Sequence, residues 1–456
     1  MSGPMALEPD GTGQETLVLR LAGTPARAHD AHPPAPQAVS RLAAGLADRI
    51  GPAVHPYEVA ALLEAEGLTA DRIREQYGHP DLFSLAAALY DQVPRTFPEP
   101  ARPADPWRPD HLRCLLRGVL FALPGLAYLL TAPLWHPGRH AAALVVAGLV
   151  SWAWGQALGH RAYVRMTSGR REAARTLLTG APLGAALATA AAVPFAGGAP
   201  PVLAAAAQSL YLAAAGVLLV LARERLLFAA LTPLIAGAAV LPWREPGNVL
   251  RTGLPLLALL ATLAVTAHTL RGTLAAPAAA DGARPRLSAS LPYGLFGLAA
   301  GLLVLLEGRR EPYAVMLLTV SMGPAEWLLY RYRGLVVAAL RATATPAGFR
   351  LRSAGVLGLC LLGYLLPLLP AARFTGAAPA GLLLLAATLW TALLLQAFGA
   401  AWPPAAVCLA AAAGAGTVTV LRLPPGPAAL PLCCGAAALC LVAYALRLLG
   451  RPARHA

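Results

Sequence analysis

A carboxylate inside an apolar run is the first candidate for chemistry in this sequence. Glu326 lies about fourteen residues into a run that has the length and composition of a membrane-crossing helix. A charge in hydrocarbon costs about 2.5 to 3.5 kcal/mol on insertion scales. No arginine follows within one helical turn, since Tyr330 occupies the i+4 position. The sequence therefore predicts that Glu326 faces a partner on another helix, a cavity or a proton path.

Two further polar residues lie in apolar runs and are candidates for the same site. Arg117 stands near the start of the first run, and Gln156 stands in the second. Arginine binds phosphate and carboxylate groups through paired hydrogen bonds, so Arg117 could clamp an anion or pair with Glu326. We hypothesise that this pair forms a gate or coupling site at the cytoplasmic mouth. The alternative is that Glu326 is protonated or snorkels, with Arg117 as an anchor at the inner face.

The elements that position these residues must be membrane helices. Of the 456 residues, 57% are hydrophobic and only 13% are charged, which is too little charge to solvate an ordinary globular surface. The mean hydropathy is +0.59. A soluble enzyme is therefore not expected. The charges are also uneven, because residues 1–110 hold 9 Arg and 15 acids whereas residues 111–456 hold 27 Arg and 7 acids.

The acidic first part of the chain divides into three segments and lacks a signal peptide, so we expect it in the cytoplasm. Residues 1–35 lack a helical or strand period and are predicted to be disordered. Residues 36–95 have helical spacing and are predicted to form a small cytoplasmic helical domain, and residues 96–110 form a proline-rich linker. The domain holds five Arg against eight acids, so nucleic acid is not an expected partner. A cytoplasmic protein partner is expected instead.

Apolar runs of about 17 to 25 residues follow residue 110, and each is long enough for a helix to cross the hydrocarbon core. Six fall within 111–272 and six within 289–449, with a cytoplasmic loop at 273–288 between them and a tail at 450–456. The predicted fold is all-α: a polytopic membrane protein with about 12 transmembrane helices in two six-helix halves, preceded by the small soluble helical domain. The approximate spans are 115–134, 141–159, 177–196, 201–221, 226–242, 250–269, 290–307, 312–330, 353–371, 378–397, 403–420 and 428–447.

Arginines mark the cytoplasmic side of this topology. With both termini inside, 20 of the 27 Arg after residue 110 fall in cytoplasmic segments or at their edges. A multi-pass protein of the cell (cytoplasmic) membrane is predicted. The two longest basic loops, after the second and eighth spans, also lie inside, and they contain Arg161, Arg165, Arg170, Arg171, Arg331 and Arg333.

A weak internal repeat relates the two halves. A shift of 170 residues aligns SWAWGQALGHRAYVR, from Ser151, with SMGPAEWLLYRYRGL, from Ser321, and pairs Gln156 with Glu326. Six spans followed by six, with the long basic loop second in each half, is the layout of transporters built from two parallel repeats about an axis normal to the membrane. Small residues at four-residue spacing are expected at helix contacts in the second and seventh spans: Ala147, Ser151, Gly155 and Gly159, and Gly297 with Gly301.

This layout resembles the multidrug/oligosaccharidyl-lipid/polysaccharide exporter superfamily, in its branch of polysaccharide and lipid-linked oligosaccharide flippases. The resemblance covers roughly residues 111–450 and rests on the two halves, on the loop YVRMTSGRREAARTLLTGAPLGAALATAAAVP, and on LYLAAAGVLLVLARERLLFAALTPLIAGA across spans four and five. It implies a flippase that moves a lipid-linked oligosaccharide or polysaccharide precursor across the membrane by alternating access. Membrane lipid and a lipid-linked glycan are the partners that it implies. The acidic N-terminal domain departs from the simplest members.

Three other classes stay open. GHRAYVRMTSGRR resembles the basic loop of major facilitators, although Val164 stands where that family has Asp. Membrane glycosyltransferases, polymerases and ligases also have about a dozen spans, but here the outer loops are short and no nucleophile, base and acid stand together, so we do not expect an enzyme. A non-transporting scaffold of cell-envelope polysaccharide assembly is the third. No cofactor or metal is expected, because the sequence has no H-E-x-x-H motif.

Overall fold

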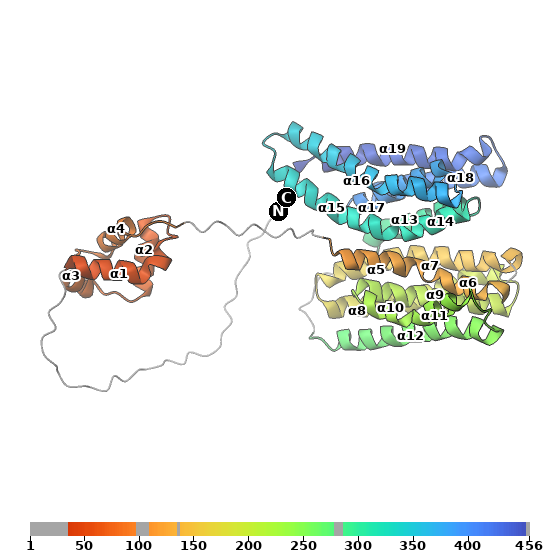
Figure 1. Cartoon of the computed structure of the whole chain (residues 1–456), viewed down its shortest axis with the longest axis horizontal. Coiled ribbons are helices and arrows are strands. Elements are labelled where there is room, and N and C mark those ends of the chain that lie inside the picture. The colour runs from red at the N-terminus through yellow and green to blue at the C-terminus, as the bar shows by residue number, and fades with distance from the viewer. Residues whose placement is uncertain (1–34, 97–108, 135–136, 278–285, 453–456) are drawn as a thin grey trace. The chain divides into compact units, whose positions relative to one another are not determined.

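The computed structural model describes residues 35–96, 109–134, 137–277 and 286–452 (Figure 1). The predicted disordered segment and nearly all of the proline-rich linker lie outside these ranges. All described elements are helices, which confirms the predicted all-α fold. The chain divides into two compact units, Met1–Ala104 and Asp105–Ala456.

The N-terminal unit is a small helical domain with its own core. Leu63, Leu85 and Leu89 are fully buried in it, and the spacing of the last two predicts this shared face. The Asp81 carboxylate accepts a hydrogen bond from the backbone N–H of Ser84 at 2.7 Å and so caps the last helix. Its helices are α1 (Ala35–Ile50), α2 (Pro56–Ala65), α3 (Ala70–Tyr77) and α4 (Leu82–Gln92).

The second unit consists of two bundles of helices, which we call lobe 1 and lobe 2 (Figure 1). Lobe 1 contains α5 (His111–Ala122), α6 (Gly125–Thr131), η1 (Ala132–Leu134), α7 (Pro137–Met166), α8 (Arg170–Ala192), η2 (Val193–Phe195), α9 (Ala199–Val220), α10 (Glu224–Ala230), α11 (Thr232–Val240) and α12 (Asn248–Leu274). Lobe 2 contains α13 (Leu287–Gly308), α14 (Pro312–Val320), α15 (Met322–Arg341), α16 (Pro346–Thr375), α17 (Pro379–Ala397), α18 (Trp402–Leu421), η3 (Gly426–Ala428) and α19 (Ala429–Leu449).

The helices of this unit have the lengths that a bilayer requires. Ten helical segments among the described residues are long and apolar enough to cross a membrane, and each coincides with one of the predicted spans. The other two predicted spans, 226–242 and 312–330, fall on the helix pairs α10–α11 and α14–α15. α10 and α11 have only 7 and 9 residues, so neither is long enough to cross the membrane alone. Glu326 lies in α15, the second helix of the other pair. The chain is therefore a multi-pass helical membrane protein.

A proline follows each of the two breaks. α10 and α11 are separated at Leu231, and Pro233 is the second residue of α11. α14 and α15 are separated at Ser321, and Pro324 is the third residue of α15. Because proline has no N–H and its ring clashes with the preceding turn, it interrupts the hydrogen-bond ladder at each break. The second break lies just before Glu326 in the sequence.

The two lobes meet along two seams. α5 packs against α14 and α15, and α7 packs against α13; we call these contacts the α5–α15 seam and the α7–α13 seam. Each seam joins the first span of one half to the second span of the other. Two related halves make this reciprocal pairing of first and second spans when a two-fold axis lies between them. The end of the unit where α5 and α13 begin, and where α7 and α15 end, is called the Arg-rich end below.

Glycine contacts bring the helices of both seams close together. A Cβ added at Gly323 would lie 3.2 Å from the Cα of Gly118, and one added at Gly297 would lie 3.1 Å from the Cα of Ala153. The 170-residue register aligns Ala153 with Gly323 but does not align Gly118 with Gly297, so it matches one residue of each contact. Gly297 therefore packs closely, as predicted.

The prediction for the small-residue ladder of the second span was wrong at two positions. A Cβ added at Gly155 would meet nothing within 4 Å, and one at Gly159 would meet only a methyl group of Val220, at 4.0 Å. α7 instead presents larger side chains, such as Trp154, to the glycines of α8, where Gly184 faces that indole. Four-residue spacing of small residues identifies a face of a helix but not what packs on it.

Candidate functional site: an ion network across the α5–α15 seam

The α5 helix presents two arginines on one face. Arg113 and Arg117 are four residues apart, so their side chains leave the helix one above the other. The helix begins at the N-cap Asp110, whose carboxylate accepts a hydrogen bond from the Arg113 backbone N–H at 3.0 Å. Cys114 and Gly118 are buried beside them, so the two guanidinium groups emerge next to the seam.

Arg117 forms an ion pair with Glu326 across the seam. Its Nη1 lies 2.5 Å from Glu326 Oε1, and the two side chains are only 20% and 21% exposed. The sequence predicts a partner for Glu326, and the structure supplies Arg117 from the other lobe. Because both groups are largely withdrawn from water, loss of Arg117 would leave Glu326 as an uncompensated charge.

A second carboxylate, Glu224, joins the network from within lobe 1. It lies at the first position of α10, and its side chain is 7% exposed. Its Oε1 accepts hydrogen bonds from Arg113 Nε at 2.8 Å and from Arg117 Nε at 2.9 Å. Arg117 Nη2 also donates to the Leu219 carbonyl oxygen at 3.3 Å. The four charged groups balance, with two cations and two anions.

An aromatic contact extends the seam beside the ion network. Trp327 follows Glu326 directly, and its indole N–H donates to His111 Nδ1 at 2.9 Å. The Arg331 guanidinium lies over the Trp327 ring, 5.8 Å from its centroid. This places a tryptophan at the Arg-rich end of the seam, where it links α15 to the start of α5.

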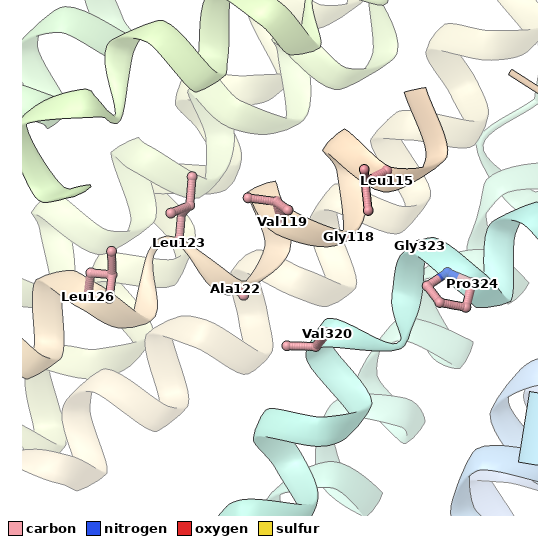
Figure 2. Close-up of a pocket in the computed structure, with 9 residues that line it drawn as sticks. All are labelled: Leu115, Gly118, Val119, Ala122, Leu123, Leu126, Val320, Gly323 and Pro324. Atoms are coloured by element: carbon pink, nitrogen blue, oxygen red, sulfur yellow. The ribbon is translucent and has the colours of Figure 1, made fainter. Parts of the chain in front are cut away.

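An apolar crevice opens along the same seam (Figure 2). Its volume is about 230 Å³, and Figure 2 shows its residues on the facing ribbons of α5–α6 and α14–α15. Leu115 and Val320 are 65% and 59% exposed, so its rim faces outward. Arg117 lies between crevice residues in the sequence of α5. The lining consists of Leu115, Gly118, Val119, Ala122, Leu123, Leu126, Val320, Gly323 and Pro324.

In the described part of the α7–α13 seam, an aromatic stack lies at the place that corresponds to the Arg117–Glu326 pair. The rings of His160 and Tyr293 stack with centroids 3.8 Å apart, and His160 Nδ1 lies 3.1 Å from the Ser290 hydroxyl. Gln156, which the register aligns with Glu326, packs against Gly297, where an added Cβ would lie 2.8 Å from the Gln156 Cγ. The two seams are equivalent in packing and different in chemistry.

We predict that the ring stack couples the two helices energetically. His160→Ala and Tyr293→Ala, singly and together, should show a coupling energy of about 0.5 to 1.5 kcal/mol in a double-mutant cycle of thermal unfolding in detergent. The matched cycle of His160 with Tyr313, which is 57% exposed on α14, should give a value near zero. Equal coupling in both cycles would show that the stack contributes nothing specific.

The predicted site residues lie at several separate places in the structure. Arg117 and Glu326 are together, whereas Gln156 belongs to the other seam and not to the ion network. Of the basic-loop arginines, Arg165 pairs with Glu172 at 2.6 Å, and the Arg171 guanidinium donates to the Ala276 carbonyl oxygen at 3.1 Å. The remaining ones are Arg161, at an intermediate level of exposure, Arg170, which is exposed, and Arg331 and Arg333, which lie over the rings of Trp327 and Phe398.

Two buried acids, Glu224 and Glu307, were not predicted as site residues from the sequence. Glu224 is the single acid of the turn ARERLL, and an acid flanked by arginines at the edge of a span was a signal for an internal ion pair. Glu307 is 3% exposed near the end of α13, where its Oε1 would lie 2.6 Å from a Cβ added at Gly381. Its position at the end of the seventh span was the only signal for it.

Alternating access requires a polar hollow between the lobes, and this hollow stays a prediction, since the two cavities described here are mainly apolar. The first is the crevice of Figure 2. The second, of about 160 Å³, lies inside lobe 1, and its few polar lining groups include Tyr128, Gln208 and Tyr211.

Comparisons with known proteins add one finding. No protein-family model matches the sequence, and no curated protein matches it. A solved structure described as "Crystal structure of MATE in complex with Br-NRF" is similar to this chain, with 13% sequence identity and a TM-score of 0.40; the match covers 77% of this chain and 98% of that chain. The function proposed below rests on this chain's own residues and contacts.

Proposed function

We propose that this protein is a transporter that moves an amphipathic, phosphate-bearing lipid across the cell membrane by alternating access. A lipid-linked oligosaccharide or polysaccharide precursor is the substrate class, and both termini lie in the cytoplasm. The observation that carries this proposal is the ion pair between Arg117 and Glu326, because it holds the two lobes together across the α5–α15 seam. A fastening of this kind can open when the lobes separate.

The chemistry of the α5–α15 seam suits a ligand with a charged head and an apolar tail. Arg113 and Arg117 lie next to each other, and guanidinium groups are the preferred partners of phosphate oxygens. The crevice on the same helix is apolar and outward-facing, so it offers a surface to a hydrocarbon chain (Figure 2). A lipid whose tail follows the crevice would bring its phosphate to these arginines.

The proposal is tested with purified protein in liposomes that contain a fluorescent polyprenyl-diphosphate sugar. Reduction of the fluorophore by dithionite from outside measures how much of the probe reaches the outer leaflet. We expect protein-dependent movement of the probe that Arg117→Ala reduces at least tenfold. Arg373→Ala, which removes an exposed arginine of α16, should move the probe at the wild-type rate. A probe that stays in its leaflet with wild-type protein would overturn the proposal and favour a water-soluble substrate or a scaffold.

A further inference from the structure

The ion network divides unevenly between the lobes. Arg113, Arg117 and Glu224 all belong to lobe 1, and they carry one net positive charge. Glu326 belongs to lobe 2 and carries one negative charge. Both bonds of Glu224 stay inside lobe 1, whereas the bond between Arg117 and Glu326 crosses the seam.

The assignment of these charged groups to the two lobes determines which of them loses its ion-pair partner when the seam opens. Arg117 keeps Glu224 as a partner in every arrangement that preserves lobe 1. Glu326 loses its partner, and an isolated carboxylate in an apolar setting is costly. Uptake of a proton removes that charge without needing any other residue.

Among the described residues of lobe 2, the first two arginines that follow Glu326 on α15 contact aromatic rings: Arg331 lies over the Trp327 ring, 5.8 Å from its centroid. α5 presents Arg113 and Cys114, which move away with lobe 1, and α10 presents the like charge of Glu224. On its own helix, Tyr330 is four residues along and has no positive charge. Arg333 lies over the Phe398 ring, 4.8 Å from its centroid, and α16 presents Tyr364 to Ser321 at 2.9 Å.

We propose, building on the transport function above, that Glu326 takes up one proton each time the α5–α15 seam opens and releases it each time the seam closes. On opening, the carboxylate and a proton from the surrounding water give a carboxylic acid. On closing, Arg117 returns and the proton leaves to water. The open state then holds a neutral Glu326 and a net positive lobe 1, which is free to attract the phosphate of a substrate. Substrate movement is thereby coupled to a proton.

Glu224 has the opposite role in this scheme. It binds the same guanidinium as Glu326 through a different nitrogen, and its negative charge repels that of Glu326. Neutralising Glu326 should therefore favour the open seam, whereas neutralising Glu224 should favour the closed one. If both carboxylates served only as structural ties, either change would loosen the seam. The signs of the two effects distinguish a proton switch from a static clamp.

The experiment measures the opening of the seam in full-length protein in lipid nanodiscs without substrate. Spin labels are placed at Leu112→Cys in α5 and Leu351→Cys in α16, which are 58% and 77% exposed, after the exposed Cys440 is replaced by Ser. Pulsed electron spin resonance then gives the fractions at short and long distance. In the wild type, the ratio of open to closed protein should rise as the pH falls from 8 to 5, by up to tenfold per unit for one linked proton.

The variants complete the test. Glu326→Gln should be open and independent of pH, Glu326→Asp should keep the pH response, and Glu224→Gln should need a lower pH to open. Glu75→Gln, which changes an exposed acid of α3, should behave as wild type. A single pH-independent distance in the wild type, an unchanged response in Glu326→Gln, or shifts of the same sign in both carboxylate variants would overturn the proposal. Because this distance measurement uses no substrate, it can succeed even if the protein moves no lipid. A failure of the proton proposal can therefore be distinguished from a failure of the proposed transport function.

Discussion

Glu326→Arg is expected to hold the α5–α15 seam open and to lower the rate of lipid movement at least a hundredfold. The new cation would face Arg117 and Arg113 in a setting where the present side chains are about four-fifths withdrawn from water. Breaking a buried ion pair costs about 3 to 5 kcal/mol, and 1.4 kcal/mol corresponds to a factor of ten in an equilibrium. Movement of the fluorescent lipid and the spin-label distance across the seam measure the two effects.

Rescue of this variant should depend on Glu224. Adding Arg117→Glu restores the attraction across the seam, but the new carboxylate would lie beside Glu224 and be repelled by it. We therefore expect the double variant to recover poorly and the triple variant with Glu224→Gln to recover most of the lost activity. Glu75→Arg is the control for charge reversal at an exposed acid of α3. Full recovery without the change at position 224 would show that Glu224 takes no part.

Gly323→Val is expected to prevent the α5–α15 seam from closing. A Cβ at this position would lie 2.7 Å from the Cys114 carbonyl oxygen and 3.2 Å from the Cα of Gly118. Both obstacles are backbone atoms of α5, so only a separation of the two helices can relieve the overlap. Overpacking of this kind costs about 1 to 3 kcal/mol, which changes the ratio of closed to open protein by roughly five-fold to more than a hundredfold.

The control for this wedge is Gly155→Val, because nothing lies within 4 Å of a Cβ built at Gly155. It adds the same atoms to a membrane helix and should leave the spin-label distance across the α5–α15 seam unchanged. If Gly323→Val gave the wild-type distance distribution, the close approach of Gly118 and Gly323 would not control the seam.

The membrane helices could be predicted from sequence because the requirement for them is local. A run must be apolar over the thickness of the hydrocarbon core, and this can be counted directly along the chain. The pairing of Glu326 was also within reach, since a charge in an apolar run requires a partner and few candidates exist. Arg117 was one of them, and it is the partner that the structure shows.

The rest of the site depends on which faces of distant helices meet. Glu224 joins Arg113 and Arg117 only because α10 folds back against α5, and no spacing in the sequence encodes that contact. The stack of His160 on Tyr293 likewise needs the pairing of α7 with α13. The ladder of Gly155 and Gly159 failed as a prediction for the same reason, because periodicity gives a face without its neighbour.

The central claim is that the α5–α15 seam must open for this protein to work, and chemical cross-linking across the crevice tests it most directly. Leu115→Cys and Val320→Cys, placed together after Cys440 is replaced by Ser, are joined by a bifunctional thiosulfonate reagent. Both positions are exposed, and Leu362→Cys with Leu366→Cys on the exposed face of α16 controls for the chemistry. We predict that the cross-link across the seam stops lipid movement, that a reductant restores it, and that the control cross-link has no effect. Unchanged movement of the lipid with the seam fully cross-linked would contradict the claim.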